Sequence, residues 1–310
     1  MLLAFVVLLV AVGVYVDSSM NRVAALTEYE GRPEAGKGTN WLLVGSDSRE
    51  DLSEEDAARL STGAPKGRRT DTIMLLHIPD NDEKPTLVSL LRDSYVPIPD
   101  NGRNKLNAAY AFGGAPLLAR TVEQATGLRL DHYLEVGLGG FADVVDSVGG
   151  VDICVKDAID DPLAGINLQP GCQELDGPSA LGYVRTRATP RADLDRVIHQ
   201  REFMGALMEK ATSPATLLNP FKLVPLLGSG PAALTLDEGD HIYHLPSFGF
   251  AMAGASSGTT ITTTVPIGGA KDVGGQVGQV QLWNKEKATQ LFEALRTDTL
   301  VPADLITKVP

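Results

Sequence analysis

The sequence predicts an α/β fold in which a central mixed β-sheet is flanked by helices. Short apolar runs, typical of buried strands, alternate along the chain with longer segments of helical periodicity. The mean hydropathy is zero and 21% of the 310 residues are charged, which argues against a polytopic membrane protein and against a disordered chain. No linker interrupts the sequence after residue 39, so we expect one globular domain over residues 40–310.

The first three strands are expected at residues 40–45, 72–78 and 86–91, each a short apolar run. A turn rich in Pro and Asp at 79–85 should send the third strand back antiparallel to the second. The later elements follow from the same criteria: strands at 132–136 and 151–155, and helices at 105–127 (interrupted by the Gly-Gly-Ala-Pro run at 113–116), 140–148, 175–185, 194–211 and 285–296.

Residues 1–16 are apolar without a break, and Asp17 ends the run. A membrane-spanning helix needs about 20 apolar residues, and the run lacks the basic segment and the cleavage site of a signal peptide. We therefore expect residues 1–16 to be the distal part of a transmembrane signal anchor that starts further upstream; a buried core helix is the alternative. Residues 17–39 are expected to form a stalk. This would be a single-pass type II protein of the cell membrane, with its domain outside the cytoplasm.

Cys154 and Cys172 flank a loop rich in Pro, Gly and Asp. Outside the cytoplasm such a pair would form a disulfide, worth about 3 kcal/mol in the loop-entropy description. Two buried free thiols are the alternative. Because the chain has only 2 cysteines, a disulfide-rich scaffold and a cysteine-only zinc site are both excluded.

Charged residues gather where the first three strands meet. The first strand ends just before Asp47, and the second begins beside Arg69 and Asp71. The third ends just before Arg92 and Asp93. The antiparallel order brings these positions to one edge of the sheet, where α/β proteins usually build sites. Aspartate oxygens suit Mg²⁺ and arginine forks suit phosphate oxygens, so we predict a site for a metal-bridged diphosphate. Salt bridges at the rim of the sheet are the alternative.

A second basic group lies further along the chain. Arg185 and Arg187 are separated by one residue, so their side chains would lie on the same face of an extended segment. Arg196 and Gln200 are one helical turn apart, just after Asp193. The net charge is −12, so this arginine-rich region indicates a local anion site, and the acidic total argues against a nucleic-acid binder. The sequence contains no GxxxxGK[ST] phosphate loop, HExxH motif or GxSxG elbow, and its five histidines show no ligand spacing.

Seven segments of the chain match one known family in order. They are LLVGSDSR (42–49), GRRTDTIML (67–75), SLLRDSYVPIP (89–99), KLNAAYAFGG (105–114), DHYLEVGLGGFADVVDSVGGVDI (131–153), LDGPSALGYVRTR (175–187) and DLDRVIHQ (193–200). Through them the chain resembles the LytR-CpsA-Psr (LCP) proteins of Gram-positive cell walls. The resemblance covers a core at residues 40–212, and the stretch up to Arg296 is similar to the C-terminal extension of actinobacterial members.

The resemblance implies a membrane-anchored extracytoplasmic transferase that moves a glycopolymer from a polyprenyl-pyrophosphate carrier onto peptidoglycan. The family's metal-site aspartates match Asp47 and Asp71, with Mg²⁺ or Mn²⁺ as cofactor. Its pyrophosphate-binding residues match Arg69, Arg92, Arg185, Arg187, Arg196 and Gln200. Four positions depart from the family's usual residues: Thr70 stands for Ser, Leu91 for Pro, Asp195 for Gly and His199 for Arg.

Catalysis would rest on positioning and on charge neutralisation by Arg92, Arg185 and Arg187 at the leaving polyprenyl phosphate. Asp93 or Asp193 is expected to act as base toward a peptidoglycan hydroxyl, which family analogy places at the 6-position of muramic acid. An apolar groove for the lipid is expected from the helical stretches 108–118 and 141–148, although ordinary core packing would explain the same residues.

Two other functions stay open at this point. A non-catalytic polyprenyl-phosphate binding module would bind the lipid without turnover. A polyprenyl-pyrophosphate hydrolase would use water as the acceptor and leave no adduct on the wall. The sequence is equally compatible with teichoic acid, arabinogalactan and capsule as the polymer.

Overall fold

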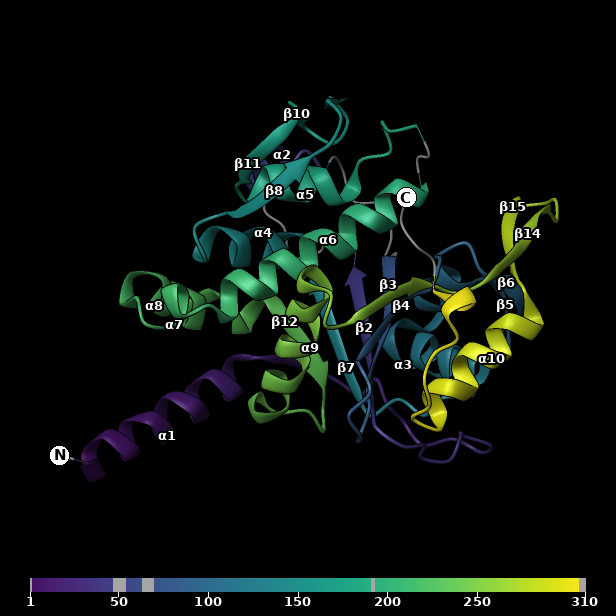
Figure 1. Ribbon diagram of the computed structural model, residues 1–310, viewed down its shortest axis with the longest axis horizontal. Helices are drawn as coiled ribbons and strands as arrows, with labels where there is room; N and C mark the ends of the chain where they lie inside the picture. The colour runs from purple at the N-terminus through teal and green to yellow at the C-terminus, as the bar shows by residue number, and fades with distance from the viewer. Residues whose placement is uncertain (1, 47–53, 63–69, 191–192, 307–310) are drawn as a thin grey trace.

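The computed structural model describes residues 2–46, 54–62, 70–190 and 193–306, and for residues 2–9, 193–194 and 229 it describes the backbone alone. Within these residues a mixed seven-stranded sheet runs through the centre of the molecule (Figure 1). This confirms the predicted α/β architecture. The strands lie across the sheet in the order β1 (Asn21–Val23), β12 (Leu234–Asp237), β7 (His132–Gly137), β2 (Thr39–Ser46), β3 (Thr70–Ile78), β4 (Thr86–Ser89) and β13 (Ile261–Thr264).

Helices cover both faces of this sheet (Figure 1). Those of the described residues are α1 (Leu2–Ser19), α2 (Glu54–Arg59), α3 (Leu106–Thr126), α4 (Leu138–Ser147), α5 (Gly177–Arg185), α6 (Asp193–Thr212), α7 (Pro214–Leu217), α8 (Pro220–Ser229), α9 (Leu245–Ser257) and α10 (Lys285–Arg296), with short 3₁₀ turns η1 (Pro231–Ala233), η2 (Ile242–His244) and η3 (Ala303–Leu305). The C-terminal helix has the bounds that its periodicity predicts.

Side chains of the central strand alternate between two cores. Leu42 and Val44 of β2 pack with α3 and α10 on one face of the sheet. Trp41 and Leu43 pack with α9 on the other. All four side chains are buried, so the period-two pattern of a strand covered on both faces is realised in this sequence.

The site is positioned by the register of β2 with its two neighbours. β2 runs antiparallel to β3 with Ser46 opposite Thr70, and parallel to β7 with Ser46 opposite Gly137. The C-terminal ends of β2 and β7 and the start of β3 therefore share one edge of the sheet. β4 returns antiparallel to β3, as the turn at 79–85 predicts, so its end comes back toward the same edge.

A disulfide-bearing unit of two hairpins stands beside α5. In the first hairpin β8 (Val151–Val155) pairs with β11 (Gly171–Leu175), and Cys154 lies opposite Cys172, to which it is disulfide-bonded. In the second, β9 (Ile159–Asp161) pairs with β10 (Ile166–Leu168). Two further hairpins pair β5 (Tyr95–Ile98) with β6 (Gly102–Lys105), and β14 (Ile267–Asp272) with β15 (Gln279–Trp283).

The two ends of the chain contribute more to the sheet than the sequence indicates. β1, within the segment expected to be a stalk, pairs with β12. β12 and β13, which the apolar pattern does not reveal, extend the sheet at its two sides. At the N-terminus, residues expected to anchor the protein form α1, and no helix in the described part of the chain is long and apolar enough to cross a membrane.

Candidate active site

Asp71 and Arg92 meet at the sheet edge that the strand order predicts. Asp71 is the second residue of β3, and Arg92 follows β4. The Arg92 Nη1 atom donates to Asp71 Oδ1 at 2.6 Å. Thr70, which replaces the family's usual serine, keeps the strand start in place because its hydroxyl donates to the carbonyl of Gly45 at 2.9 Å.

Asp93 lies next to this pair. Its Oδ2 atom accepts from Nε of Arg92 at 3.3 Å, and its Oδ1 atom lies 2.9 Å from Nζ of Lys105. Each oxygen of Asp93 is thus engaged by a cationic side chain. The contact fixes the direction in which the Arg92 guanidinium points.

Three arginines from distant parts of the chain act on the Asp71 carboxyl. Burial is the largest single influence and raises its pKa, but the charge and hydrogen bond of Arg92, together with the charges of Arg196 and Arg187, hold the pKa below its usual value. Arg187 and Arg196 are therefore near enough for their fields to be felt at Asp71. The structure brings the two predicted basic groups to one place.

The segment that carries Arg185 and Arg187 is fixed by the second hairpin. Arg185 is the last residue of α5, and its Nη1 atom donates to the carbonyl of Leu60 at 3.3 Å. The buried hydroxyl of Thr186 donates to Asp161 at 2.7 Å. A Cβ at Gly182 would lie 2.2 Å from the Ile166 side chain, so only glycine lets α5 pack this closely on the hairpin.

Arg196 and Gln200 come from the first turns of α6 and are buried, with 4% and 6% of their surface exposed. The Nε2 atom of Gln200 donates to the carbonyl of Val184 at 3.1 Å. This bond ties α6 to α5 one residue before Arg185. The predicted helical spacing is thus observed, and it places both side chains on the same wall of a cavity.

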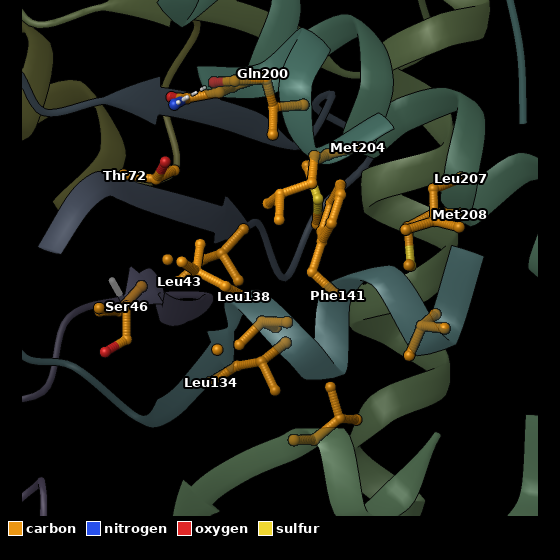
Figure 2. A pocket seen from close by; sticks show the side chains of 18 of the residues that line it. Leu43, Ser46, Thr72, Leu134, Leu138, Phe141, Gln200, Met204, Leu207 and Met208 are labelled. Carbon is orange, nitrogen blue, oxygen red and sulfur yellow. Dashed lines mark hydrogen bonds between the residues drawn. The ribbon is translucent and has the colours of Figure 1, made fainter. Parts of the chain in front are cut away.

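That cavity has a volume of about 360 Å³ and is lined almost entirely by apolar side chains. It lies between the sheet, α4, α6 and α9, and Figure 2 shows Leu43, Phe141 and Met204 around it. Its polar lining residues are Ser46, Asp71, Thr72, Arg185, Arg196, Gln200 and Thr212. An apolar cavity edged by arginines has the chemistry of a site for a lipid with an anionic head.

Of the two helical stretches expected to border an apolar groove, one lines this cavity. α4 contributes Leu138, Phe141 and Val144 to the cavity. The stretch 108–118 of α3 contributes nothing to it, because its buried side chains, Leu118 among them, pack in the core on the opposite face of the sheet.

Three predicted site residues fall wholly or in part outside the described residues. Asp47 and Arg69 lie outside the described residues. Asp193 is the first residue of α6, and its side chain also lies outside the description. The predicted pairing of Asp47 with Asp71 in a metal site therefore stays a prediction.

A cluster with two histidines was not predicted from the sequence. One ligand atom from each of His132, Asp240 and His244 lies within 4.8 Å of the others, so the group could hold a metal ion. His132 is the first residue of β7. The predicted site lies at the edge of the sheet where β7 ends, at Gly137. The cluster is therefore separate from the predicted metal-binding aspartates. Asp240 follows β12, which pairs with β7, the strand that His132 begins. Because these residues are far apart in the sequence, their spacing does not indicate the cluster.

The chain belongs to the LytR-CpsA-Psr family: the model of the LytR_cpsA_psr family matches residues 13–290. It is 52% identical over 291 residues to the "Probable cell wall biosynthesis protein LcpB" of Corynebacterium glutamicum, a match that covers 94% of this chain and 68% of that protein.

More distant relatives agree with this membership. The chain is 34% identical over 198 residues to the polyisoprenyl-teichoic acid–peptidoglycan teichoic acid transferase TagU of Oceanobacillus iheyensis, covering 61% of this chain and 57% of that protein. The LytR-Csp2A-Psr enzyme from Actinomyces oris shares the fold, with a TM-score of 0.67 at 22% identity over 90% of this chain and 96% of that one.

Proposed function

We propose that this protein transfers a glycopolymer from a polyprenyl-diphosphate carrier onto peptidoglycan. One observation carries the proposal: an apolar cavity of about 360 Å³ meets Asp71, Arg185, Arg196 and Gln200 at its polar rim. A polyprenyl diphosphate has the same division into an apolar chain and an anionic head. The transferase activity named for the TagU relative supports the same reaction class.

The diphosphate would lie against the arginines, with its lipid chain in the apolar cavity. Arg185, Arg187 and Arg196 would neutralise its charge, and Arg92 would hold Asp71 in place through their 2.6 Å contact. The acceptor hydroxyl oxygen bonds to the phosphorus that bears the glycopolymer. The bond from that phosphorus to the bridging oxygen breaks, and polyprenyl phosphate leaves with the electron pair.

The hydroxyl proton must pass to a base. Because both oxygens of Asp93 already contact Arg92 and Lys105, we assign Asp93 to positioning Arg92. Asp193, at the start of α6, is then the preferred base. Acceptor hydroxyls could approach through a second cavity of about 590 Å³, which Asp71, Arg92 and Arg187 also line.

A divalent cation fits the described part of the site. The Asp71 carboxyl has a lowered pKa, so it is ionised at neutral pH, and its side chain is 40% exposed. Hard cations prefer such oxygens. Asp71 would hold Mg²⁺ or Mn²⁺ together with Asp47, and the ion would supply further neutralisation of the diphosphate charge.

We also propose that the domain works outside the cytoplasm at the cell membrane. The unbroken apolar run at 1–16 would serve for membrane attachment. The disulfide between Cys154 and Cys172 suits an oxidising compartment. Labelling of an introduced surface cysteine by a membrane-impermeant reagent in whole cells tests this placement, since a cytoplasmic domain would stay unlabelled until lysis.

The reaction is tested by incubating the purified protein with a lipid-linked oligosaccharide, Mg²⁺ and peptidoglycan fragments, followed by mass spectrometry. We expect a phosphodiester adduct between the oligosaccharide and the fragment, with release of polyprenyl phosphate. Oligosaccharide phosphate without an adduct would instead show a hydrolase. Bound but unchanged donor would show a non-catalytic binding module.

A further inference from the structure

Three cavities meet at the proposed reaction centre, and only one of them is apolar. The cavity of about 590 Å³ shares Asp71 with the apolar cavity. A third, of about 880 Å³, shares Ser46, Gly137 and Leu138 with it. The apolar cavity suits the lipid, so the two polar cavities are left for the saccharide parts of the reactants.

A single aromatic side chain lies on the wall between the two polar cavities. Phe112 of α3 lines both of them, together with Ala111. Its surface is 53% exposed. Single exposed apolar residues are common on proteins, but this one lies where two cavities beside the reaction centre share their lining.

The backbone of α3 is built to present this ring. The helix breaks directly after Phe112, where Gly113 and Gly114 leave helical geometry. Gly114 has a φ of 63° and a ψ of −154°, a conformation that only glycine adopts without strain. The first part of α3 therefore ends at Phe112, with its ring at the break and not inside a continuous helix.

Polar side chains that can form hydrogen bonds also line the cavity of about 880 Å³. Glu135 lines it and accepts hydrogen bonds from the hydroxyls of Tyr110 at 2.5 Å and Tyr133 at 2.6 Å. Arg59 and Asp143 form another wall, 3.6 Å apart. The Glu135 carboxylate is held in a fixed direction by the two tyrosine hydroxyls, as orienting groups in a ligand site are.

An aromatic face beside a fixed carboxylate has the chemistry that recognises a sugar ring. The C–H face of a pyranose packs on the electron-rich face of an aromatic ring, and its hydroxyls donate to carboxylates. We propose that Phe112 and the cavity lined by Glu135 form a saccharide subsite next to the diphosphate. The proposal rests on the proposed transferase function, and the sugar could belong either to the donor glycopolymer or to the peptidoglycan acceptor.

The experiment compares Phe112→Ala with Phe112→Trp, which keeps an aromatic face. Phe250→Ala is the matched control, since Phe250 is 70% exposed on α9 and lines none of these three cavities. Three probes are titrated calorimetrically: a polyprenyl diphosphate without sugar, the same lipid carrying a disaccharide, and a soluble peptidoglycan disaccharide-peptide. Thermal melting verifies that each variant is folded.

We expect Phe112→Ala to weaken binding of one sugar-bearing probe about 10-fold and to leave the sugar-free lipid within about twofold. Loss confined to the disaccharide-lipid assigns the subsite to the donor, and loss confined to the disaccharide-peptide assigns it to the acceptor. Phe112→Trp and Phe250→Ala should bind like the wild type.

Unchanged binding of both sugar-bearing probes would overturn the subsite, as would an equal loss for the sugar-free lipid. A wild-type protein that fails to bind the sugar-free lipid contradicts the proposed function instead. The effect of Phe112→Ala on the two sugar-bearing probes still decides the subsite in that case, so the two failures are distinguishable.

Discussion

Thr186 donates a hydrogen bond of 2.7 Å to Asp161, and this contact joins the disulfide-bearing hairpins to the segment that carries Arg185 and Arg187. Burial raises the pKa of Asp161, but this bond and those from the backbone N–H groups of Ala164 and Arg187 hold it below its usual value. The carboxylate is therefore charged and fully engaged. The contact therefore fixes the residue that lies between the two arginines.

Thr186→Val removes the hydroxyl at nearly constant volume, whereas Thr186→Ser keeps it. We expect the valine variant to lose about 1–2 kcal/mol of unfolding free energy and to bind polyprenyl diphosphate about 10-fold more weakly. The serine variant should recover most of both. Urea unfolding and calorimetric titration measure the two effects. A valine variant with unchanged affinity would mean that Asp161 only stabilises the fold.

We expect the arginines at the site to bind the diphosphate through planar two-point hydrogen bonds and not through their charge alone. We expect Arg185→Ala, Arg187→Ala and Arg196→Ala each to cost about 30- to 1000-fold in diphosphate binding or kcat/KM. Arg→Lys should rescue poorly, because an ammonium cannot make the planar two-point contact.

Arg129→Ala is the control for this scan. Arg129 pairs with Glu28 at 2.8 Å on the surface and lines none of the three cavities, so its loss should be nearly neutral. If Arg129→Ala proves as damaging as the three site variants, general positive charge and not a shaped site explains the binding.

Asp71 should contribute to stability in a pH-dependent way. Its folded pKa is below the usual 3.8 despite partial burial, because of Arg92 and the charges of Arg196 and Arg187. A depressed folded pKa gives stability that is complete above the unfolded value and is lost as the pH falls through the folded value. The difference in unfolding free energy between wild type and Asp71→Asn should stay constant from about pH 5 to 8 and shrink below about pH 4. A difference that grows in acid would contradict this reading.

The disulfide should stabilise the unit that holds Asp161. Replacing both Cys154 and Cys172 by serine should cost about 3 kcal/mol, the value for a closed loop of this size. Denaturant unfolding of oxidised and reduced protein measures it, and a non-reducing peptide map should show the linked pair. Free thiols on both residues in oxidised, folded protein would disprove the link.

The sequence predicts the sheet centre well because β2, β3, β4 and β7 are short apolar runs covered on both faces. β12 and β13 escape prediction because their sequences, LTLD and ITTT, are short and rich in polar residues. They become strands only because the neighbouring strands β7 and β4 offer free hydrogen-bonding edges. Pairing across long sequence distances overrides local composition in such strands.

The candidate site was predictable where strand order or helical spacing places the residues. Asp71 and Arg92 meet through the hairpin of β3 and β4, and Arg196 and Gln200 through one turn of α6. The sequence did not show which of the two expected helices would line the apolar cavity. A helix can line the cavity only if it packs on that side of the sheet. The apolar pattern of a helix is the same whichever side it covers, so the pattern does not reveal the side.

If the apolar cavity holds the lipid chain, narrowing it should weaken the binding of long lipids more than that of short ones. Val144→Trp fills space against α4, so we expect it to weaken binding of a long polyprenyl diphosphate much more than that of a geranyl diphosphate. Leu217→Trp, on the exposed side of α7, is the control. An equal loss of affinity for both lipids would mean that the lipid chain binds elsewhere.

A crystal structure of the protein with a polyprenyl diphosphate and Mg²⁺ would test the proposed binding site most directly. We expect a lipid chain between α4 and α6, and phosphate oxygens within hydrogen-bond distance of Arg185, Arg187 and Arg196. A lipid bound on another surface, or a diphosphate that leaves these three arginines untouched, would contradict the proposed binding site.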